Sequence, residues 1–175
     1  CRITQKGTTL TVLTMRRVLA ALIVAFLACA IATPAKAATK EVKGPNGQIL
    51  KASASSVKSC EVITVRGRYF DETVGIYLGF CVIPKAGKSQ TPCVGGINKD
   101  GTGDTSLWIS SNPPPYGSGL AEEFLPGGRF TKKLTVSRKI GKFDCKKVKC
   151  AITVRADHLR SEDRSFDLFI PITIK

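Results

Sequence analysis

Two cysteines and the only histidine of the chain lie close together in the stretch FDCKKVKCAITVRADHLRSEDRS, residues 143–165. Residues of these types could bind a metal, form a redox pair or take part in catalysis. A zinc site would need a second pair of ligands besides Cys145 and Cys150, which His158 alone does not supply. A redox motif would have two residues between its cysteines, whereas here there are four. The pattern therefore favours structural disulfides.

His158 is the residue most suited to acid–base chemistry. It could act as a general base with Asp157 or Asp163, or bind a haem or metal. Catalysis would need an activated nucleophile beside it, and no G-x-S-x-G or comparable signature occurs in the sequence. We therefore expect a surface-loop histidine, and we predict a non-enzymatic protein without catalytic, cofactor-binding or metal-binding residues.

The residues around His158 are densely charged, with both signs alternating. Such a run could recognise a charged ligand, but we expect it to lock its own loop through bidentate ion pairs. The residues concerned are Arg155, Asp157, Arg160, Glu162, Asp163 and Arg164.

Trp108 and Tyr116 flank the proline-rich segment SSNPPP. An exposed loop of aromatic residues and prolines could form a contact site. We expect instead that Trp108 packs over the edge of the fold.

The N-terminal part of the chain has the pattern of an export signal. Met15 is followed by two arginines, the apolar run VLAALIVAFLACAIA (18–32) and the small-x-small motif at Ala35–Ala37. This predicts a signal peptide at residues 15–37, a mature chain from Ala38 and, in residues 1–14, a segment upstream of the true start. The apolar run is short for a membrane span. A lipid anchor at Cys29 is the alternative.

Export decides how the remaining cysteines are interpreted. Removal of the leader leaves Cys60, Cys81, Cys93, Cys145 and Cys150 in the mature chain. Outside the cytosol, cysteines at such spacings are typically joined in disulfides. Because five cysteines cannot all be paired within one chain, one remains unpaired, and we expect this to be Cys60. It would be either a half-buried residue without a role at the start of a strand or a reactive thiol.

The spacing of turns and short strand-like runs in the mature chain is typical of an all-β protein. Residues 38–47 form a polar lead-in, and the domain itself is predicted at 48–175. Short β-branched or alternating runs are separated by Gly- and Pro-rich turns, and only GLAEEFL (119–125) could form a short helix. These features predict an immunoglobulin-like β-sandwich of about seven antiparallel strands. The runs are ILKASA, CEVITVRG, VGIYLGFCVI, TSLWIS, RFTKKLTV, CAITVRA and FDLFIPITI.

Several stretches resemble the neocarzinostatin-like immunoglobulin-fold family. They are GIYLGFC, TPCVGG, WISSNPPPYGSGLA, PGGRF, the D-C-x4-C motif leading into CAITVRADHLRSEDRS, and FIPITI. The sequence is still more similar to an uncharacterised actinobacterial group of secreted or surface domains. Sequence proximity and this resemblance together imply two short-range disulfides, Cys81–Cys93 and Cys145–Cys150, with Cys60 left as a free thiol.

The resemblance also implies an alternative role, as the carrier of a small apolar, antibiotic-like ligand. Antibiotic carriers of that family are acidic proteins, whereas this chain is strongly basic. Five of its 27 Lys and Arg residues and none of its 13 Asp and Glu residues lie in residues 1–37, so the predicted mature chain carries a net charge of +9. We also expect no aromatic cleft wall from the segment VIPKAGKSQT (82–91).

Basic residues gather around the last two cysteines. The cluster has one acidic neighbour, Asp144, and its field would attract anionic polymers or lipid head groups. No motif that reads DNA or RNA occurs, so any binding of nucleic acid would be non-specific. We name this the basic cluster, and its residues are Arg138, Lys139, Lys142, Lys146, Lys147 and Lys149.

The sequence as a whole predicts a secreted, non-enzymatic binding module at the bacterial cell envelope, which engages an anionic partner through the basic cluster. Retention at the cell wall stays open. The alternative is a neocarzinostatin-type apoprotein that carries a small apolar ligand, with an antibacterial and non-specific DNA-associated role. No cofactor is predicted, and no transmembrane span is expected after removal of the leader.

Overall fold

A computed structural model describes residues 39–95 and 106–175 of the chain. Eleven strands and three short 3-10 helices make up its regular structure. The strands are β1 (Lys40–Lys43), β2 (Ile49–Ala52), β3 (Ser56–Val57), β4 (Val62–Arg68), β5 (Ile76–Val82), β6 (Ser106–Ile109), β7 (Phe130–Thr135), β8 (Lys139–Ile140), β9 (Phe143–Asp144), β10 (Cys150–Ala156) and β11 (Leu168–Ile174). The 3-10 helices are η1 (Pro115–Gly117), η2 (His158–Arg160) and η3 (Arg164–Phe166).

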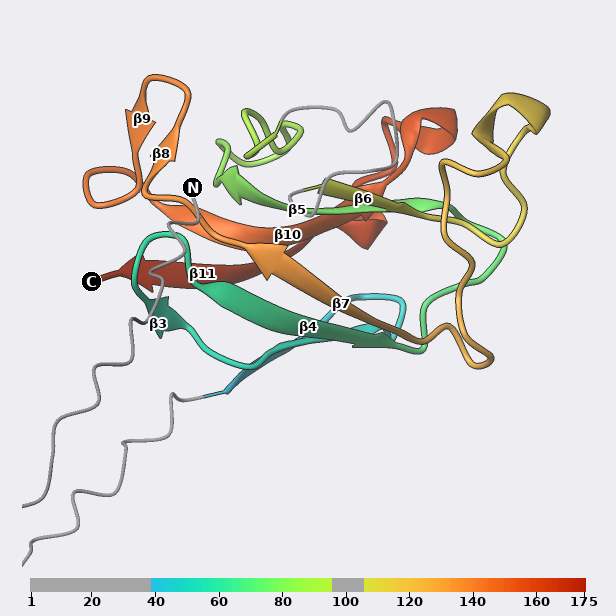
Figure 1. Cartoon of the computed structure of the whole chain (residues 1–175). Coiled ribbons are helices and arrows are strands. Elements are labelled where there is room, and N and C mark those ends of the chain that lie inside the picture. The colour runs from blue at the N-terminus through green and yellow to red at the C-terminus, as the bar shows by residue number, and fades with distance from the viewer. Residues whose placement is uncertain (1–38, 96–105) are drawn as a thin grey trace, which may run out of the picture. The chain divides into compact units, whose positions relative to one another are not determined.

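The strands form a two-layer sandwich (Figure 1). One sheet has the order β1-β2-β4-β7, and the other has the order β3-β11-β10-β5-β6. Pairing within the sheets is antiparallel except between β3 and β11. A separate two-stranded ribbon, β8-β9, projects from one end of the sandwich. The predicted all-β sandwich is confirmed, and all seven predicted strands are present.

The core lies between the two sheets, because side chains alternate between the two faces of each strand. In β5, Ile76, Leu78 and Phe80 are fully buried against the other sheet. Each contributes about 1.5–3 kcal/mol through removal of its apolar surface from water. The alternate residues of β5, among them Tyr77, face away from the core. The outer face of the five-stranded sheet is thereby left for other contacts.

Two segments are arranged differently from what their sequences suggest. The polar lead-in at 38–47 contains β1, which pairs with β2 from Lys40↔Ala52 to Lys43↔Ile49. As an edge strand on the sandwich surface it buries little, so its sequence carries almost no apolar alternation. The segment 119–125 is not a helix: Gly119 has a φ of 80°, and the backbone N–H of Glu122 donates to Trp108 O at 2.9 Å.

The two predicted disulfides are confirmed. Cys81 is joined to Cys93, and Cys145 to Cys150, with Cα–Cα distances of 4.0 and 5.5 Å. Cys60 is also disulfide-bonded in the 175-residue chain, so the predicted free thiol is not free there. That prediction supposed that Cys1 and Cys29 leave with the leader, and for a chain that begins at Ala38 it stays a prediction.

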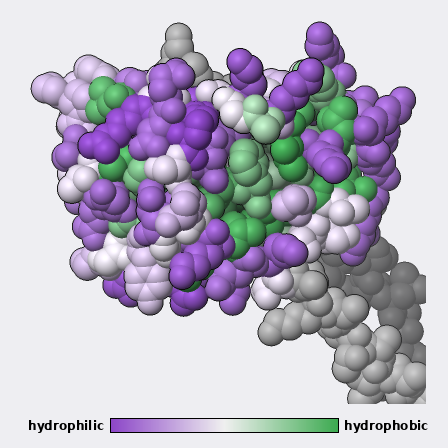
Figure 2. Space-filling view, turned by 180° about the vertical axis from the view of Figure 1, so that it is seen from behind, coloured by the Kyte–Doolittle hydropathy of each residue, from purple (hydrophilic) through white to green (hydrophobic). Residues whose placement is uncertain are grey.

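The predicted upstream segment (1–14), signal peptide (15–37) and lipid-anchor alternative at Cys29 lie outside the described residues. Within 39–95 and 106–175, no helix is both long and apolar enough to cross a membrane. On the face shown in Figure 2, hydrophilic residues cover most of the surface and surround exposed hydrophobic residues in the middle.

Candidate ligand-binding cleft

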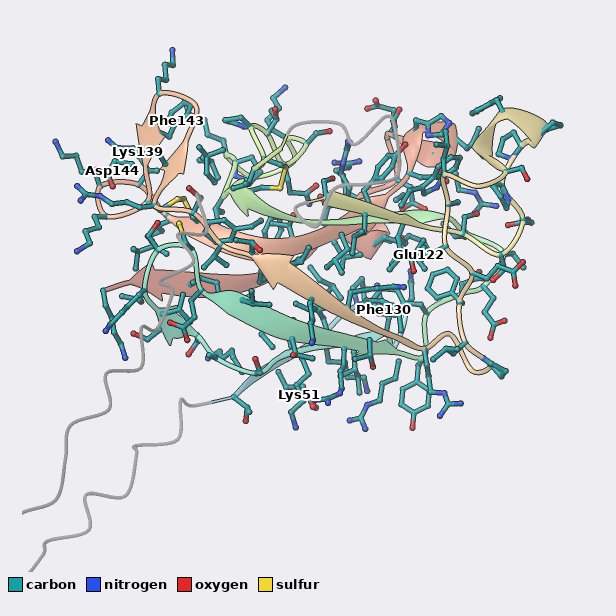
Figure 3. The ribbon with its side chains drawn as sticks, viewed as in Figure 1. Lys51, Glu122, Phe130, Lys139, Phe143 and Asp144 are labelled. Atoms are coloured by element: carbon teal, nitrogen blue, oxygen red, sulfur yellow. A yellow bond between two sulfur atoms is a disulfide. The ribbon has the colours of Figure 1, made fainter. Side chains whose placement is uncertain are left out.

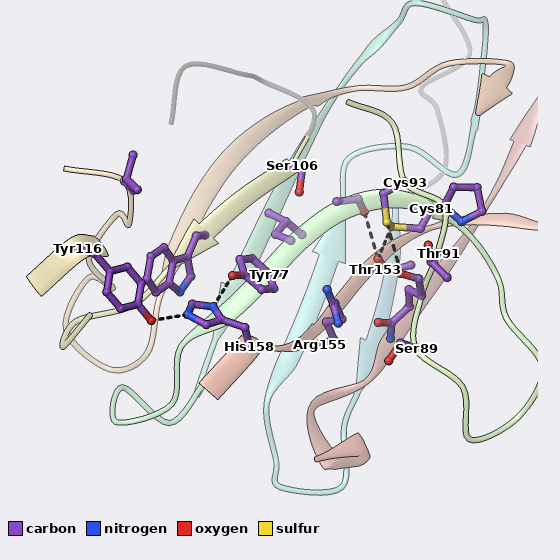
Figure 4. Close-up of a pocket in the computed structure, with 16 residues that line it drawn as sticks. Tyr77, Cys81, Ser89, Thr91, Cys93, Ser106, Tyr116, Thr153, Arg155 and His158 are labelled. Carbon is purple, nitrogen blue, oxygen red and sulfur yellow. Dashed lines mark hydrogen bonds between the residues drawn. A yellow bond between two sulfur atoms is a disulfide. The ribbon is translucent and has the colours of Figure 1, made fainter. Parts of the chain in front are cut away.

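A cleft of about 580 Å³ opens on the outer face of the five-stranded sheet (Figure 4). Its floor comes from β5, β6 and β10, and its walls come from residues 89–93, from Tyr116 and Leu120, and from His158. The volume lies within the range of about 300–1,000 Å³ that is usual for small-molecule sites.

The floor of the cleft contains a row of three large side chains set by strand register. Tyr77 of β5 lies directly opposite Arg155 on β10 and opposite Trp108 on β6. The guanidinium carbon of Arg155 lies 5.2 Å from the centroid of the Tyr77 ring, and the Tyr77 and Trp108 centroids are 6.1 Å apart. The row is a consequence of the β10-β5-β6 order, because directly opposed residues in adjacent strands point to the same face.

His158 lies in the cleft wall, between two tyrosines. Its Nδ1 is 2.5 Å from the Tyr77 hydroxyl, and its Nε2 is 2.7 Å from the Tyr116 hydroxyl (Figure 4). When the imidazole is neutral, one nitrogen donates and the other accepts, so one tyrosine accepts a hydrogen bond and the other donates one. His158 is exposed, as expected, but it is not an isolated surface-loop histidine because both of its nitrogens are engaged.

Asp157 ties Trp108 to the segment that carries His158. The carboxylate is buried, with 1% of the residue exposed, and its Oδ2 accepts a hydrogen bond from Trp108 Nε1 at 3.0 Å. Its Oδ1 caps η2 by accepting from the backbone N–H of Leu159 at 3.0 Å. Trp108 lies on the edge strand β6, where packing at the edge of the fold was predicted, and its ring lines the cleft.

Tyr77 is kept in its neutral form. Burial raises the pKa of its hydroxyl, and the negative charge of Asp157 raises it further. At neutral pH the hydroxyl therefore serves as a hydrogen-bonding group rather than as an anion.

The loop after β5 forms a second, more polar wall, and three kinds of bond hold it against the sheet. The Cys81–Cys93 disulfide and the hydrogen bond from Val82 N to Pro92 O at 3.0 Å join it to β5. Gln90 donates from Nε2 to the carbonyl of Val154 at 3.4 Å. The Cys81–Cys93 disulfide therefore positions a wall of the cleft, in addition to stabilising the fold.

The charged run 155–164 is not locked by a set of ion pairs, contrary to prediction. Asp163 caps η3 by accepting hydrogen bonds from Ser165 N at 2.9 Å and Ser165 Oγ at 2.7 Å, which lower the pKa of its carboxyl. Asp157 caps η2 in the same way. Arg164 forms an ion pair at 3.4 Å, but with Asp167, outside the run. The two 3-10 turns need capping acceptors, and the carboxylates serve that purpose.

Sequence reasoning missed Tyr77. No aromatic wall was expected from residues 82–91, and indeed the aromatic side chains come from elsewhere, namely from Tyr77, Trp108 and Tyr116. The one available signal was the alternation of inward and outward positions along each strand. It places Tyr77, Trp108 and Arg155 on the face opposite to the buried residues.

The basic cluster is brought together on the β8-β9 ribbon and the turn that follows it (Figure 3). Arg138 and Lys139 are engaged by the buried Asp144, at N–O distances of 2.8 and 3.2 Å. The Arg138 guanidinium holds the pKa of Asp144 well below its ordinary range. Lys142 lies near the Phe143 ring, and the exposed side chains on the turn closed by Cys145–Cys150 are Lys146, Lys147 and Lys149.

Among the residues with described positions, no group of three or more His, Cys, Asp or Glu side chains is arranged to hold a metal ion.

Comparison with known proteins adds little to what the structure itself shows. No protein-family model matches the chain, and no curated protein matches its sequence. Among solved structures, macromomycin is similar, with a TM-score of 0.45 and 15% sequence identity over 73% of this chain and 99% of that chain. A similarity this low assigns no function. Membership of the neocarzinostatin-like family and the likeness to the actinobacterial group stay predictions.

Proposed function

We propose that the protein is a non-enzymatic binding protein for a small, largely apolar ligand that contains an aromatic ring. The observation that carries this proposal is the cleft lined by Tyr77, Trp108 and Tyr116 on the outer face of the five-stranded sheet. Stacked and edge-on ring contacts in such a site favour a planar aromatic ligand.

The aromatic side chains of the cleft add little to the core of the sandwich. Ile76, Leu78 and Phe80 already fill the inner face of β5. Tyr116, by contrast, has 61% of its surface exposed. Large aromatic side chains that gather outside a complete core, around a cleft of ligand size, indicate a binding surface.

A role in binding also agrees with the state of His158. Both ring nitrogens are engaged by tyrosine hydroxyls, which leaves neither of them for the activation of a Ser, Thr or Cys nucleophile. The two disulfides support a location outside the cytosol, where such bonds persist.

The proposal predicts saturable, one-to-one binding of a neutral aromatic probe such as N-phenyl-1-naphthylamine. Trp108 is the only tryptophan of the chain and lies in the cleft, so its fluorescence should change as the site fills. Tyr116→Ala should lower the affinity about tenfold, because about 1.4 kcal/mol of ring contact is lost.

Tyr69→Ala is the matched control for this titration. Tyr69 has 63% of its surface exposed, nearly the same as Tyr116, but it does not line the cleft. Its replacement should leave the affinity unchanged. Equal losses in the two variants, or binding that does not saturate, would contradict the proposal.

A second candidate function is the predicted one, binding of an anionic partner through the basic cluster. It is favoured by the exposure of Lys146, Lys147 and Lys149 on one disulfide-closed turn, which lowers the entropic cost of presenting them together. An envelope polymer or anionic lipid head groups would suit these lysines, and a cation near an anionic surface contributes about 1 kcal/mol.

Charge reversal tests this second candidate. Replacing Lys146, Lys147 and Lys149 with Glu should abolish binding to vesicles of phosphatidylglycerol and phosphatidylcholine at low salt. Replacing Lys43, Lys51 and Lys133 with Glu controls for the change in net charge, because these three lysines are exposed on the four-stranded sheet. This control variant should keep much of the binding. Binding should weaken as salt rises, because screening at physiological ionic strength acts over about 8 Å. Equal effects of the two triple variants would argue against a site on the turn.

A further inference from the structure

We propose that the ligand of the cleft carries an acidic group, and that Arg155 binds this group. The inference rests on the proposed function and adds the chemical class of the ligand, an aromatic acid. Arg155 extends from the outer face of β10 into the cleft and is half-buried there (Figure 4). Among the residues of 39–95 and 106–175, no acidic side chain lines the cleft beside it.

Two carboxylates that could balance the charge of Arg155 make their direct contacts elsewhere. Asp157 accepts from Trp108 and from the cap of η2. Asp167 forms an ion pair through Oδ2 with Arg164 at 3.4 Å. Burial raises the pKa of its carboxyl, and the charge of Arg155 acts on that carboxyl only at longer range, in the opposite direction. Within the described residues, no carboxylate lies within ion-pair distance of the Arg155 guanidinium, and its N–H groups make no hydrogen bond.

This leaves a half-buried cation whose own protein contact is the face of the Tyr77 ring. A cation–π contact of this kind leaves the five N–H donors of the guanidinium unused. A ligand that covers the cleft would remove water from those donors, and a neutral ligand would give nothing in return. A carboxylate, sulfonate or phosphate can accept two parallel hydrogen bonds from the guanidinium and so replaces the lost water.

The two ends of the cleft differ in chemistry, and this difference determines how such a ligand would lie. One end holds the rings of Tyr77 and Tyr116, and the Trp108 centroid lies 6.1 Å from that of Tyr77. The other end holds the hydroxyl-bearing residues Ser89, Thr91 and Thr153. Arg155 lies between these ends in Figure 4. A ring packed at the aromatic end would therefore bring a directly attached acidic group to the guanidinium. The net positive charge of the chain would also draw an anion toward the site.

A matched pair of ligands tests the inference. 2-Naphthoate and 2-naphthamide have the same ring system and nearly the same shape, but the first is an anion and the second is neutral. Calorimetric titration should show the acid binding about tenfold or more tightly than the amide. Arg155→Gln should weaken binding of the acid about 10- to 100-fold and change that of the amide less than about twofold. Arg155→Lys, which keeps the charge without the planar fork, should lie between the two.

Arg160→Gln controls for the loss of one positive charge. Arg160 is exposed and does not line the cleft, so this variant should bind both compounds as the unmodified protein does. Thermal unfolding of each variant shows whether the fold is kept. A folded Arg155→Gln variant that loses both compounds to the same extent would overturn the acid-binding role.

The other outcomes separate the two proposals. Equal affinity of the unmodified protein for the acid and the amide would overturn the acidic-group inference and leave the aromatic-binding function standing. Failure to bind either naphthalene compound or the neutral probe would overturn both. Tighter binding of the acid that survives in Arg155→Gln would place the anion at another cation.

Discussion

Replacing Asp157 with alanine should lower the stability of the fold and the affinity for an aromatic ligand together. The buried carboxylate accepts one hydrogen bond from Trp108 Nε1 and one from Leu159 N. Hydrogen bonds to a charged group contribute about 1.5–3 kcal/mol each, and the indole N–H would lose its partner. We expect the free energy of unfolding to fall by about 3 kcal/mol. Affinity for an aromatic probe should fall about tenfold, because Trp108 and the turn that carries His158 lose their anchor.

Two other substitutions separate the effect on the cleft from the effect on the fold. Asp157→Asn keeps one acceptor oxygen and should lie between the unmodified protein and the alanine variant in both properties. Asp163→Ala removes the comparable cap of η3, which does not line the cleft, so it should lower stability by about 1 kcal/mol and leave affinity unchanged. Urea unfolding and fluorescence titration measure the two quantities. Equal affinities for Asp157→Ala and Asp163→Ala would show that Asp157 acts only on stability.

The strands that build the core were predictable because burial imposes a period of two on their sequences. In β11 the buried residues Leu168, Ile170 and Ile172 alternate with residues that are more exposed. β1 was missed because it is an edge strand in which only Val42 is even half-buried. Its pairing depends on backbone hydrogen bonds with β2, which leave no apolar pattern in the sequence.

The cleft could not be predicted as a site from the sequence, although each of its side chains could be placed on a strand or a loop. Tyr77, Tyr116 and His158 come from three distant segments, and the hydrogen bonds between them depend on the positions of β5, η1 and η2. The alternation of inward and outward positions along each strand assigns Tyr77 and Arg155 to the outer face of the sheet. Their opposition in adjacent strands follows from the β10-β5 pairing, which sequence alone does not fix.

The basic cluster shows the same limit. The density of Lys and Arg is plain in the sequence, but the engagement of Arg138 and Lys139 is not. It depends on the burial of Asp144 at the end of the β8-β9 ribbon, where the carboxylate also accepts from Lys146 N at 3.0 Å. A cluster of six predicted cations therefore includes two whose charges are already balanced in part by the protein itself.

The two disulfides differ in what they position, and their removal should show it. Cys81→Ala with Cys93→Ala opens a link between residues 12 apart and should lower the free energy of unfolding by about 3 kcal/mol. Cys145→Ala with Cys150→Ala opens a link between residues 5 apart and should lower it by about 2 kcal/mol. These values follow from the entropy that each closed loop removes from the unfolded chain.

Ligand affinity should separate the two double variants far more clearly than stability does. The loop that Cys93 holds against β5 carries Ser89, Gln90 and Thr91 of the cleft wall. Without the bond, these residues must be ordered when the ligand binds, at about 0.5–1.5 kcal/mol for each immobilised side chain, so affinity for an aromatic probe should fall about tenfold or more. The turn closed by Cys145–Cys150 does not line the cleft, and its loss should leave affinity unchanged. Fluorescence titration of both variants, at a temperature where each is fully folded, measures the difference. If the first variant kept full affinity, the hydrogen bonds from Val82 N and Gln90 Nε2 would be sufficient to hold the wall, and the disulfide would serve the fold alone.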